Sequence, residues 1–177
     1  MDQFVVISGC SGSGKSTLLS ELKGRGCAVV EEPGRRIIAE ASAGDEAILP
    51  WVNPEAFARR AIELSLDDRN GARNAAGWVF FDRGLIDAAA ALQYVTGQPA
   101  LTGYGLSQSY NRHVFMIPPW PEIYRKDEQR RHNLDDAIAE YRRLLKAFSE
   151  LKYEPIILPK VDVHQRADVI LERLKLA

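Results

Sequence analysis

The sequence has little of the features that mark several specialised classes of protein. Only two of its 177 residues are cysteines, Cys10 and Cys27, which is too few for the disulfide framework of a small secreted domain. Its formal net charge is −1, so no strong overall field attracts nucleic acid or an anionic membrane surface. We therefore expect a protein of the reducing cytoplasm that binds neither nucleic acid nor membrane.

Long hydrophobic runs, internal repeats and low-complexity tracts are also absent. The uncharged stretch 88–111 is interrupted by polar residues and is not a membrane span. A strand pattern begins almost at Met1, so no signal peptide is expected. His113 and His132 show no metal-ligand spacing, and nothing in the sequence indicates an oligomeric state. The length and the 46% hydrophobic content predict one domain, residues 1–177, with a sizeable core.

Short apolar runs alternate with longer helical patterns along the chain. The runs lie at 4–7, 28–30, 78–81, 114–117 and 155–158. The helical patterns lie at 15–23, 35–43, 54–75, 85–95, 134–151 and 163–174. Continuous apolar runs are typical of parallel strands that helices cover on both faces. The alternation predicts a three-layer, doubly wound α/β fold with five parallel strands, whose ligands bind beyond the carboxyl ends of the strands.

A complete phosphate-binding loop with the pattern G-x-x-x-x-G-K-S/T lies between the first run and the first helix. Its residues are Gly9, Cys10, Ser11, Gly12, Ser13, Gly14, Lys15 and Ser16, and Thr17 follows. The glycines let backbone N–H groups point at phosphate oxygens, and the helix N-terminus adds partial positive charge. Lys15 can reach the β- and γ-phosphates, and Ser16 can hold Mg²⁺. The flanking strand and helix favour a nucleotide site over a ligand-free Gly/Ser turn.

Acidic residues follow the second and third runs. A carboxylate of Glu31 or Glu32 would face the phosphates and could orient or deprotonate an attacking hydroxyl, unless the pair is only a solvated acidic turn. Asp82 ends a Walker-B-type run and can hold Mg²⁺ or its water shell, although it could also cap the helix at 85–95. Arg83 would point its planar fork at a phosphate. Asp87 could position an acceptor or lie on the surface.

The segment 118–133 after the fourth run carries four basic side chains within 125–131, mixed with acids. Such a cluster can form a lid that closes over the transferring phosphate and excludes water. Arg125, Arg130 and Arg131 are then the candidates for contact with the phosphate. The alternative is a salt-bridged face exposed to solvent, which is the commoner fate of mixed charge runs.

These motifs together resemble the small P-loop kinases that act on nucleosides, nucleoside monophosphates and ribosylnicotinamide. The resemblance is closest to bacterial predicted ATPases often filed as AAA-type, near the kinase domain of the nicotinamide-riboside enzymes. The stretches that carry it are 8–17, 31–36, 80–87, 114–131 and 153–166. Glu32-Pro33 resembles the strand end of deoxynucleoside kinases, where the glutamate is the base. Asp82-Arg83 resembles the Asp-Arg or Glu-Arg pair of the same kinases and of thymidylate kinases. The basic run at 125–131 resembles the lid of these kinases.

Two differences from other P-loop classes argue against membership of those classes. A mechanical AAA+ ATPase usually carries Asp-Glu at the end of this strand, whereas here Arg83 follows Asp82. A Ras-like GTPase would carry an N-K-x-D tetrad for guanine, and the sequence has none. The resemblance therefore implies ATP as the phosphate donor.

Two functional hypotheses follow. The first is a phosphotransferase that moves the γ-phosphate of ATP to a small, nucleoside-like or other metabolite. In it Lys15 and the loop amides hold the phosphates, Ser16 and Asp82 serve Mg²⁺, and Glu32 acts on the acceptor. Arg83 and the lid arginines would stabilise the transferring group. The second is a regulatory nucleotide-binding ATPase with slow hydrolysis and a protein partner.

Overall fold

Five parallel strands form one sheet in the computed structural model, which describes residues 3–10, 12–41, 46–121 and 134–175. The strands are β1 (Phe4–Gly9), β2 (Ala28–Val30), β3 (Val79–Asp82), β4 (His113–Ile117) and β5 (Glu154–Ile157). Their order in the sheet is β2-β3-β1-β4-β5, and every neighbouring pair is parallel. All of the predicted strands are present, and the five-stranded parallel sheet is confirmed.

The predicted helices are also present. They are α1 (Lys15–Gly24), α2 (Pro33–Ala41), α3 (Pro54–Gly71), α4 (Leu85–Thr96), α5 (Leu134–Glu150) and α6 (Val163–Lys175). Short 3₁₀ turns lie at Glu46–Ile48, Ala72–Asn74 and Leu106–Gln108. Helix α2 begins two residues before the predicted start, because Pro33 lacks an N–H and suits the first turn of a helix. Helix α3 ends at Gly71 instead of residue 75, and the chain continues there as a 3₁₀ turn.

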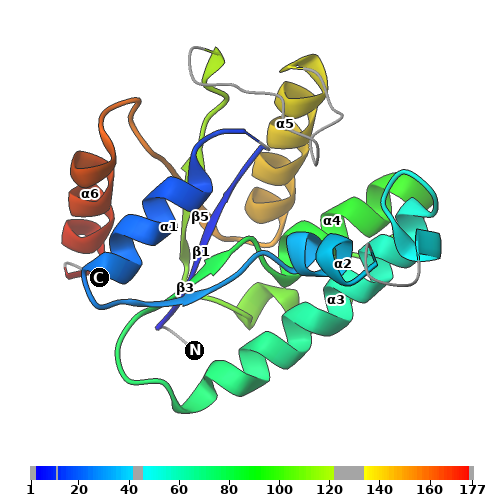
Figure 1. Ribbon diagram of the computed structural model, residues 1–177, viewed down its shortest axis with the longest axis horizontal. Coiled ribbons are helices and arrows are strands. Elements are labelled where there is room, and N and C mark those ends of the chain that lie inside the picture. The colour runs from blue at the N-terminus through cyan, green and yellow to red at the C-terminus, as the bar shows by residue number, and fades with distance from the viewer. Residues whose placement is uncertain (1–2, 11, 42–45, 122–133, 176–177) are drawn as a thin grey trace.

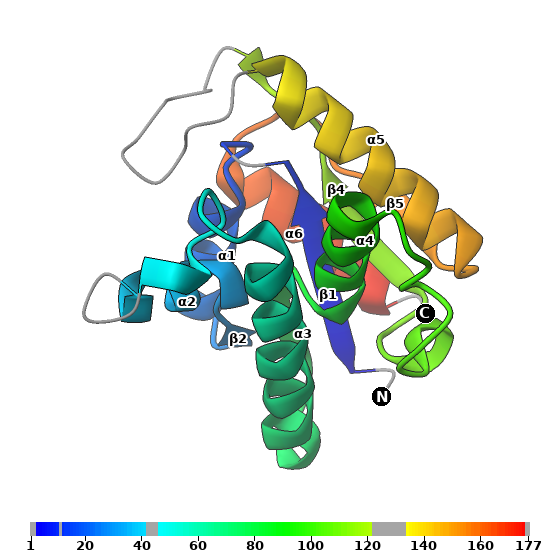
Figure 2. The same cartoon turned by 90° about the vertical axis from the view of Figure 1, so that its right-hand side faces the viewer.

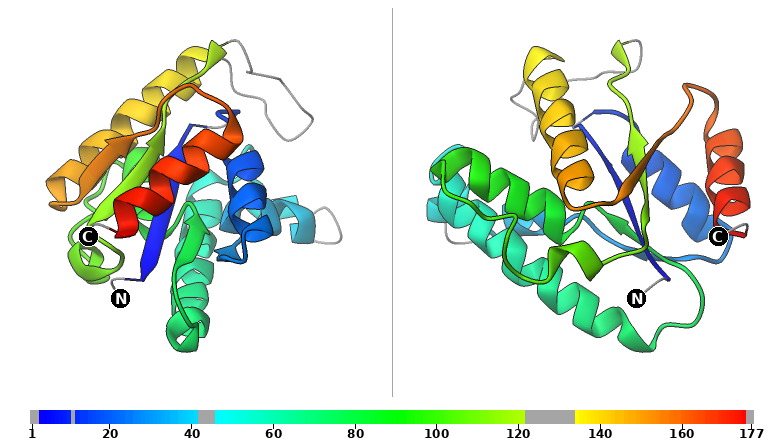
Figure 3. Two further views of the ribbon diagram at one scale, coloured as in Figure 1. Left: turned by 90° about the vertical axis from the view of Figure 1, so that its left-hand side faces the viewer. Right: turned by 180° about the vertical axis from the view of Figure 1, so that it is seen from behind.

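Helices cover both faces of the sheet (Figures 1 and 2), and the side chains of β1 alternate between two apolar layers. Phe4 and Val6 of β1 pack with residues of α3, α4 and α5, whereas Val5 and Ile7 pack with residues of α1 and α6. Figure 3 shows α1 and α6 side by side on their face of the sheet. This alternation is the period of two that a strand buried on both faces requires, and it produces the three-layer fold.

The carboxyl ends of the parallel strands meet at one edge of the sheet, where the phosphate-binding loop follows β1. Strand β1 lies between β3 and β4, with Ile7 beside Asp82 and Gly9 beside Ile117. From β1 the chain passes to β2 and returns to β3 on one side of β1, and it then crosses to β4 and β5 on the other side. Ligands bind at such a reversal of strand order. In the described part of the chain, no helix has the length and apolarity needed to span a bilayer.

Candidate active site

The phosphate-binding loop leaves β1 in a conformation that only glycine allows. Gly9 has φ +139°, and a Cβ atom there would lie 2.4 Å from the carbonyl oxygen of Ile117 on β4. Gly14 has φ +86° and caps α1 without any side-chain hydrogen bond, so the first N–H groups of the helix remain for an anion. Cys10 and Ser13 are buried in the loop; Ser11 lies outside the described residues.

Lys15 is folded over the loop at the start of α1. Its Nζ donates to the carbonyl oxygen of Cys10 at 2.9 Å and to that of Gly9 at 3.4 Å. Ser13 Oγ donates to the same Cys10 carbonyl at 2.8 Å. Burial lowers the pKa of Lys15, and the nearby Arg83 guanidinium lowers it further. In the described part of the chain its hydrogen bonds go to carbonyl oxygens, and a buried ammonium gains from an anionic phosphate.

Ser16 and Asp82 line one cavity of about 330 Å³ between α1, β2 and β3. Ser16 and the following Thr17 are exposed on the first turn of α1, whereas Asp82 is only 6% exposed at the end of β3. Asp82 Oδ1 is buried and has no hydrogen-bond partner among the described residues. Burial raises the pKa of Asp82 to about 6, although Lys15 opposes the shift. A further cation beside Oδ1 would favour the ionised carboxylate.

The oxygen atoms of Ser16 and Asp82 are suitable ligands for Mg²⁺. A hydroxyl oxygen and one carboxylate are hard ligands, and Mg²⁺ typically takes one or two carboxylates together with phosphate oxygens and waters. In the described ranges no three His, Cys, Asp or Glu residues gather into a complete metal cage. The buried, unpartnered Oδ1 of Asp82 is the atom that such an ion would satisfy.

Glu32 lies between β2 and α2 and contacts two arginines. Its Oε1 is 3.3 Å from Arg83 Nε, and its Oε2 is 3.2 Å from Arg35 Nε. Glu32 lines the cavity that contains Ser16 and Asp82, and it also lines a second cavity on the far side of Arg83. Its neighbour Glu31 is exposed and lines the first cavity but not the second. Of the two glutamates, Glu32 is the one that joins the cavities.

Arg83 is held in a strained turn directly after β3. Its φ is +60°, an unusual value for a residue other than glycine. Its Nη1 is 2.7 Å from Glu140 Oε1 on α5, and its Nε faces Glu32. Burial by itself would lower the pKa of Arg83, but Glu140 and Glu32 outweigh that effect and hold the pKa above its ordinary value.

The structure corrects two interpretations of the residues around this turn. The N-cap of α4 is Gly84 and not Asp82. Asp87 is 5% exposed, so a surface position is wrong for it. Its Oδ2 accepts the Gly84 N–H at 3.0 Å, and its Oδ1 accepts the Ser8 hydroxyl at the end of β1. Asp87 thus ties the turn that carries Arg83 to the strand that carries the phosphate-binding loop.

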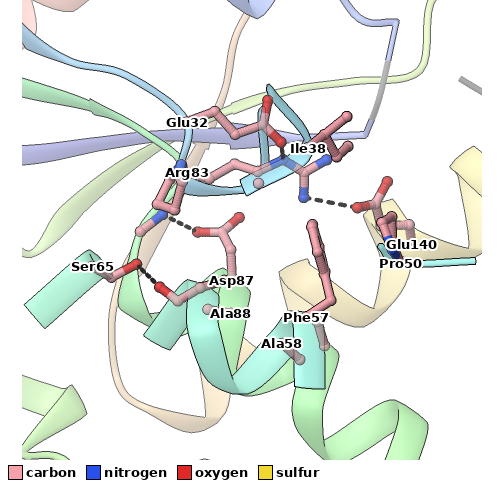
Figure 4. A pocket seen from close by; sticks show the side chains of 15 residues that line it. Glu32, Ile38, Pro50, Phe57, Ala58, Ser65, Arg83, Asp87, Ala88 and Glu140 are labelled. Carbon is pink, nitrogen blue, oxygen red and sulfur yellow. Dashed lines mark hydrogen bonds and ion pairs between the residues drawn. The ribbon is translucent and has the colours of Figure 1, made fainter. Parts of the chain in front are cut away.

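The second cavity measures about 210 Å³ and lies between α2, α3, α4 and α5 (Figure 4). Glu32, Arg83, Asp87 and Glu140 line its polar part. Its apolar part is lined by Ile38, Pro50, Phe57, Ala58, Ala61 and Ala88, among others. Sequence reasoning missed Glu140 and Phe57, because both belong to amphipathic helices in which no motif distinguishes a cavity residue from a core or surface residue.

The remaining predicted site residues, Arg125, Arg130 and Arg131, lie outside the described residues. Of the segment 118–133, only 118–121 is described. The structure thus brings together Lys15, Glu32, Asp82 and Arg83, together with the loop residues around them. The role assigned to each of them stays a prediction.

Solved structures of small-molecule kinases share this fold. A deoxyadenosine kinase from M. mycoides with bound dATP is 16% identical, with a TM-score of 0.62 over 97% of this chain and 99% of that chain. A shikimate kinase from Acinetobacter baumannii in complex with shikimate is 16% identical, with a TM-score of 0.59 over 98% of this chain and 93% of that chain. Identities this low establish the fold alone.

No curated protein matches the chain in sequence. A family model described as an AAA domain matches residues 4–166, which span the sheet, the phosphate-binding loop and the start of α6. The chain therefore belongs to this AAA domain family and is a small P-loop NTPase with a kinase-like fold.

Proposed function

We propose that the chain, acting as one domain, transfers the γ-phosphate of ATP to a small-molecule acceptor. The position of Glu32 between two cavities carries this proposal. One cavity adjoins Ser16 and Asp82, where the phosphates and their ion would lie. The other adjoins Arg83 and has the partly apolar walls of a site for a small metabolite. A simple hydrolase needs only water as its acceptor, so a second cavity that shares the acidic residue favours a transferase.

The residues have the following roles in the proposed reaction. The loop amides and Lys15 bind the phosphates, and Ser16 with Asp82 would hold Mg²⁺, which supplies positive charge to the β- and γ-phosphate oxygens. Glu32 orients the acceptor and accepts its proton. The acceptor oxygen then forms the new bond to the γ-phosphorus, and the bond from that phosphorus to the bridging oxygen of ADP breaks. Arg83 stabilises the charge on the transferring group.

Arg83 also separates this proposal from the regulatory ATPase. The residue after Asp82 is an arginine, whereas a mechanical AAA+ ATPase usually has a glutamate there to activate water. In the structure this arginine lines the second cavity, and its Nη1 is 2.7 Å from Glu140 Oε1. The arrangement suits transfer to a bound acceptor better than regulated hydrolysis.

A screen with γ-labelled ATP tests the proposal. The protein is incubated with Mg²⁺, labelled ATP and pools of nucleosides, sugars, alcohols, hydroxy acids and nucleoside monophosphates. At least one pool should raise ATP turnover well above the rate with water alone and yield a labelled product. The Lys15→Ala variant should be slower by orders of magnitude while still folded. Slow hydrolysis that no acceptor accelerates would instead support the regulatory ATPase.

A further inference from the structure

Arg83 contacts two glutamates, and the two contacts differ in kind (Figure 4). Its Nη1 is 2.7 Å from Glu140 Oε1, the distance of a charge-assisted hydrogen bond. Its Nε is 3.3 Å from Glu32 Oε1, but this buried Nε has no hydrogen-bond partner among the described residues. The contact with Glu32 is therefore an ion pair without a hydrogen bond. Glu140 makes the directional contact that can fix the plane of the guanidinium.

Glu140 reaches Arg83 from the inward face of α5. Buried Ala137, Tyr141 and Leu144 form an apolar stripe on this helix. Glu140 has the same helical spacing, and its side chain is 30% exposed. A carboxylate that is partly removed from water needs a charged or hydrogen-bonding partner, and Arg83 is one such partner. The apolar stripe of α5 thus directs this carboxylate at the turn after β3.

The electrostatics of the site agree with this arrangement. Burial by itself would lower the pKa of Arg83, and among the charges that raise it Glu140 acts more strongly than Glu32. Burial also lowers the pKa of Lys15, and Glu140 is one of the charges that oppose this shift. The carboxylate of Glu140 therefore lies within electrostatic range of both Arg83 and the phosphate-binding loop.

The backbone alone does not determine where the guanidinium lies. The N–H of Arg83 donates to the Ile7 carbonyl at 3.0 Å, and the φ of Arg83 is +60°. These features fix the Cα atom, but an arginine side chain has several rotatable bonds and a large rotamer entropy. A hydrogen bond at the far end of the side chain is what selects one orientation.

Loss of the contact with Glu140 would let the guanidinium turn toward Glu32. Arginine and carboxylate groups readily form bidentate pairs, and Glu32 is already 3.3 Å from Nε. A closer pair would occupy oxygens of Glu32 that the proposed reaction needs for the acceptor. Glu140 engages Nη1, and an arginine has further N–H donors for the oxygens of a phosphate.

We propose that Glu140 is a positioning residue for phosphoryl transfer. It orients the Arg83 guanidinium toward the transferring phosphate and keeps it from a closer pair with Glu32. This proposal rests on the proposed function and adds to it a residue that acts through Arg83. One hydrogen bond to Nη1 is enough for this role, so Glu140 and Glu32 can each have other partners, as Glu32 has in Arg35 at 3.2 Å.

A double-mutant cycle tests whether Glu140 acts through Arg83. The rate of transfer of labelled γ-phosphate is measured with the acceptor, or with water if no acceptor is found. Glu140→Leu should lower kcat by about 10- to 100-fold with little change in nucleotide affinity, because a misplaced group affects the transition state most. In an Arg83→Asn background the same change should cost less than about threefold. Asparagine suits this background because it tolerates the left-handed backbone of residue 83.

Further variants separate this role from a general effect on α5. Glu150→Leu removes the same charge at the exposed end of the helix and should leave kcat unchanged. Glu140→Gln retains an oxygen that can accept the hydrogen bond and should recover part of the rate. Losses that multiply in the double variant would show that Glu140 acts independently of Arg83, as it would by binding the acceptor, and would overturn the proposal. An unchanged kcat in Glu140→Leu would also overturn it.

Nuclear magnetic resonance tests the orientation of Arg83 without any substrate. The side-chain ¹⁵N–¹H signals of Arg83 are identified by their absence from Arg83→Asn. In wild type the Nη signals should be separate on cooling, because the hydrogen bond to Glu140 hinders rotation of the guanidinium, and Glu140→Leu should average them. Glu140→Ala replaces Glu140→Leu if the latter does not fold. Averaged signals in wild type would overturn the proposal even for an active kinase, whereas separate signals in a protein without any acceptor would count against the proposed function alone.

Discussion

At the scale of single residues, the candidate site depends on charges that the fold buries. Lys15 and Asp82 are both almost fully buried, and burial lowers the pKa of the lysine and raises that of the aspartate. Each shift records a free-energy cost that an ionised ligand of opposite charge would offset. These costs support the proposal that phosphate binds beside Lys15 and a cation beside Asp82, and they lower the stability of the ligand-free protein.

Asp82→Asn should stabilise the ligand-free protein and abolish its use of Mg²⁺. The folded pKa of Asp82 is about 6 and its ordinary value is 3.8, so the folded state holds the extra proton between these pH values. Wild type consequently loses stability as pH rises through this window, and the asparagine variant does not. At about pH 8 the variant should be more stable by on the order of 1–3 kcal/mol.

Urea unfolding at about pH 8 and about pH 4 measures this difference, and the gap between the two proteins should shrink at the lower pH. Asp67→Asn, an exposed aspartate on α3, is the control and should show almost no change at either pH. A variant less stable than wild type at the higher pH would contradict the argument.

Glu32→Gln should reduce turnover with acceptor by about a hundredfold or more, because a general base contributes at least that much. Nucleotide affinity should change little, since Glu32 faces Arg83 and Arg35 and does not belong to the phosphate-binding loop. Glu31→Gln is the matched control, because Glu31 is exposed and does not line the second cavity. Steady-state kinetics with the acceptor measures both variants. A larger loss of turnover in Glu31→Gln than in Glu32→Gln would reject Glu32 as the general base.

At the scale of elements, the turn from β3 into α4 is held by hydrogen bonds to β1, to Tyr110 and to the first turn of α4 itself. The N–H of Arg83 donates to the Ile7 carbonyl on β1 at 3.0 Å. The N–H of Gly84 donates to Asp87, and the N–H of Leu85 donates to Tyr110 Oη at 2.9 Å. These bonds fix a turn whose arginine has a left-handed backbone, and they orient its guanidinium toward Glu140.

Gly84→Ala should disturb this turn. The φ of Gly84 lies in the extended region, which alanine also adopts. The difficulty is space, because a Cβ atom at Gly84 would lie 2.6 Å from Tyr110 Oη. Overpacking of this kind costs roughly 1–3 kcal/mol of unfolding free energy, and displacement of Arg83 should lower turnover as well. Chemical denaturation and steady-state kinetics measure the two effects.

Two further variants test whether the close approach to Tyr110 causes the loss of stability in Gly84→Ala. Gly71→Ala is the matched control, because a Cβ atom there meets nothing within 4 Å. Tyr110→Ala removes both the oxygen at 2.6 Å and the ring carbon Cζ at 2.9 Å, so Gly84→Ala should cost less unfolding free energy in a Tyr110→Ala background than in wild type. Equal effects of Gly84→Ala and Gly71→Ala would show that the close approach to Tyr110 is unimportant.

At the scale of the whole molecule, the candidate site is assembled from segments that only the sheet brings together. The phosphate-binding loop follows β1 and Glu32 follows β2. Asp82 ends β3, Arg83 comes directly after it, and Glu140 comes from α5. Any ligand that contacts these segments binds the folded chain and not the unfolded one. Binding should consequently stabilise the entire fold by mass action.

Nucleotide with Mg²⁺ should raise the melting temperature. At about one hundred times the dissociation constant, the gain is about 2.7 kcal/mol, which corresponds to roughly 5–10 °C for a chain of this size. Differential scanning fluorimetry with a non-hydrolysable ATP analogue measures the shift. Removing Mg²⁺ with EDTA should abolish most of it, and Lys15→Ala should show little shift even with Mg²⁺. An unchanged melting temperature at saturating nucleotide would argue against a nucleotide site.

The sequence by itself determined the strand and helix pattern, the P-loop class and the principal site candidates. Strands that are buried on both faces are apolar throughout, and the phosphate-binding loop is a contiguous motif, so both can be recognised locally. Glu32, Asp82 and Arg83 could be predicted because each lies directly after or at the end of a strand. In a parallel sheet those ends converge at one edge, and position along the chain then implies position in space.

Only the tertiary structure decided which carboxylates face Arg83, that Asp87 is buried, and that Glu32 joins two cavities. Glu140 and Phe57 come from helices far from β3 in sequence, and their amphipathic patterns indicate which face is buried but not what it is buried against. Asp87 occupies a helix N-terminus, where an exposed acid and a buried one have the same local signature. Such contacts arise when helices pack across a sheet, and this packing depends on the shape of the whole core.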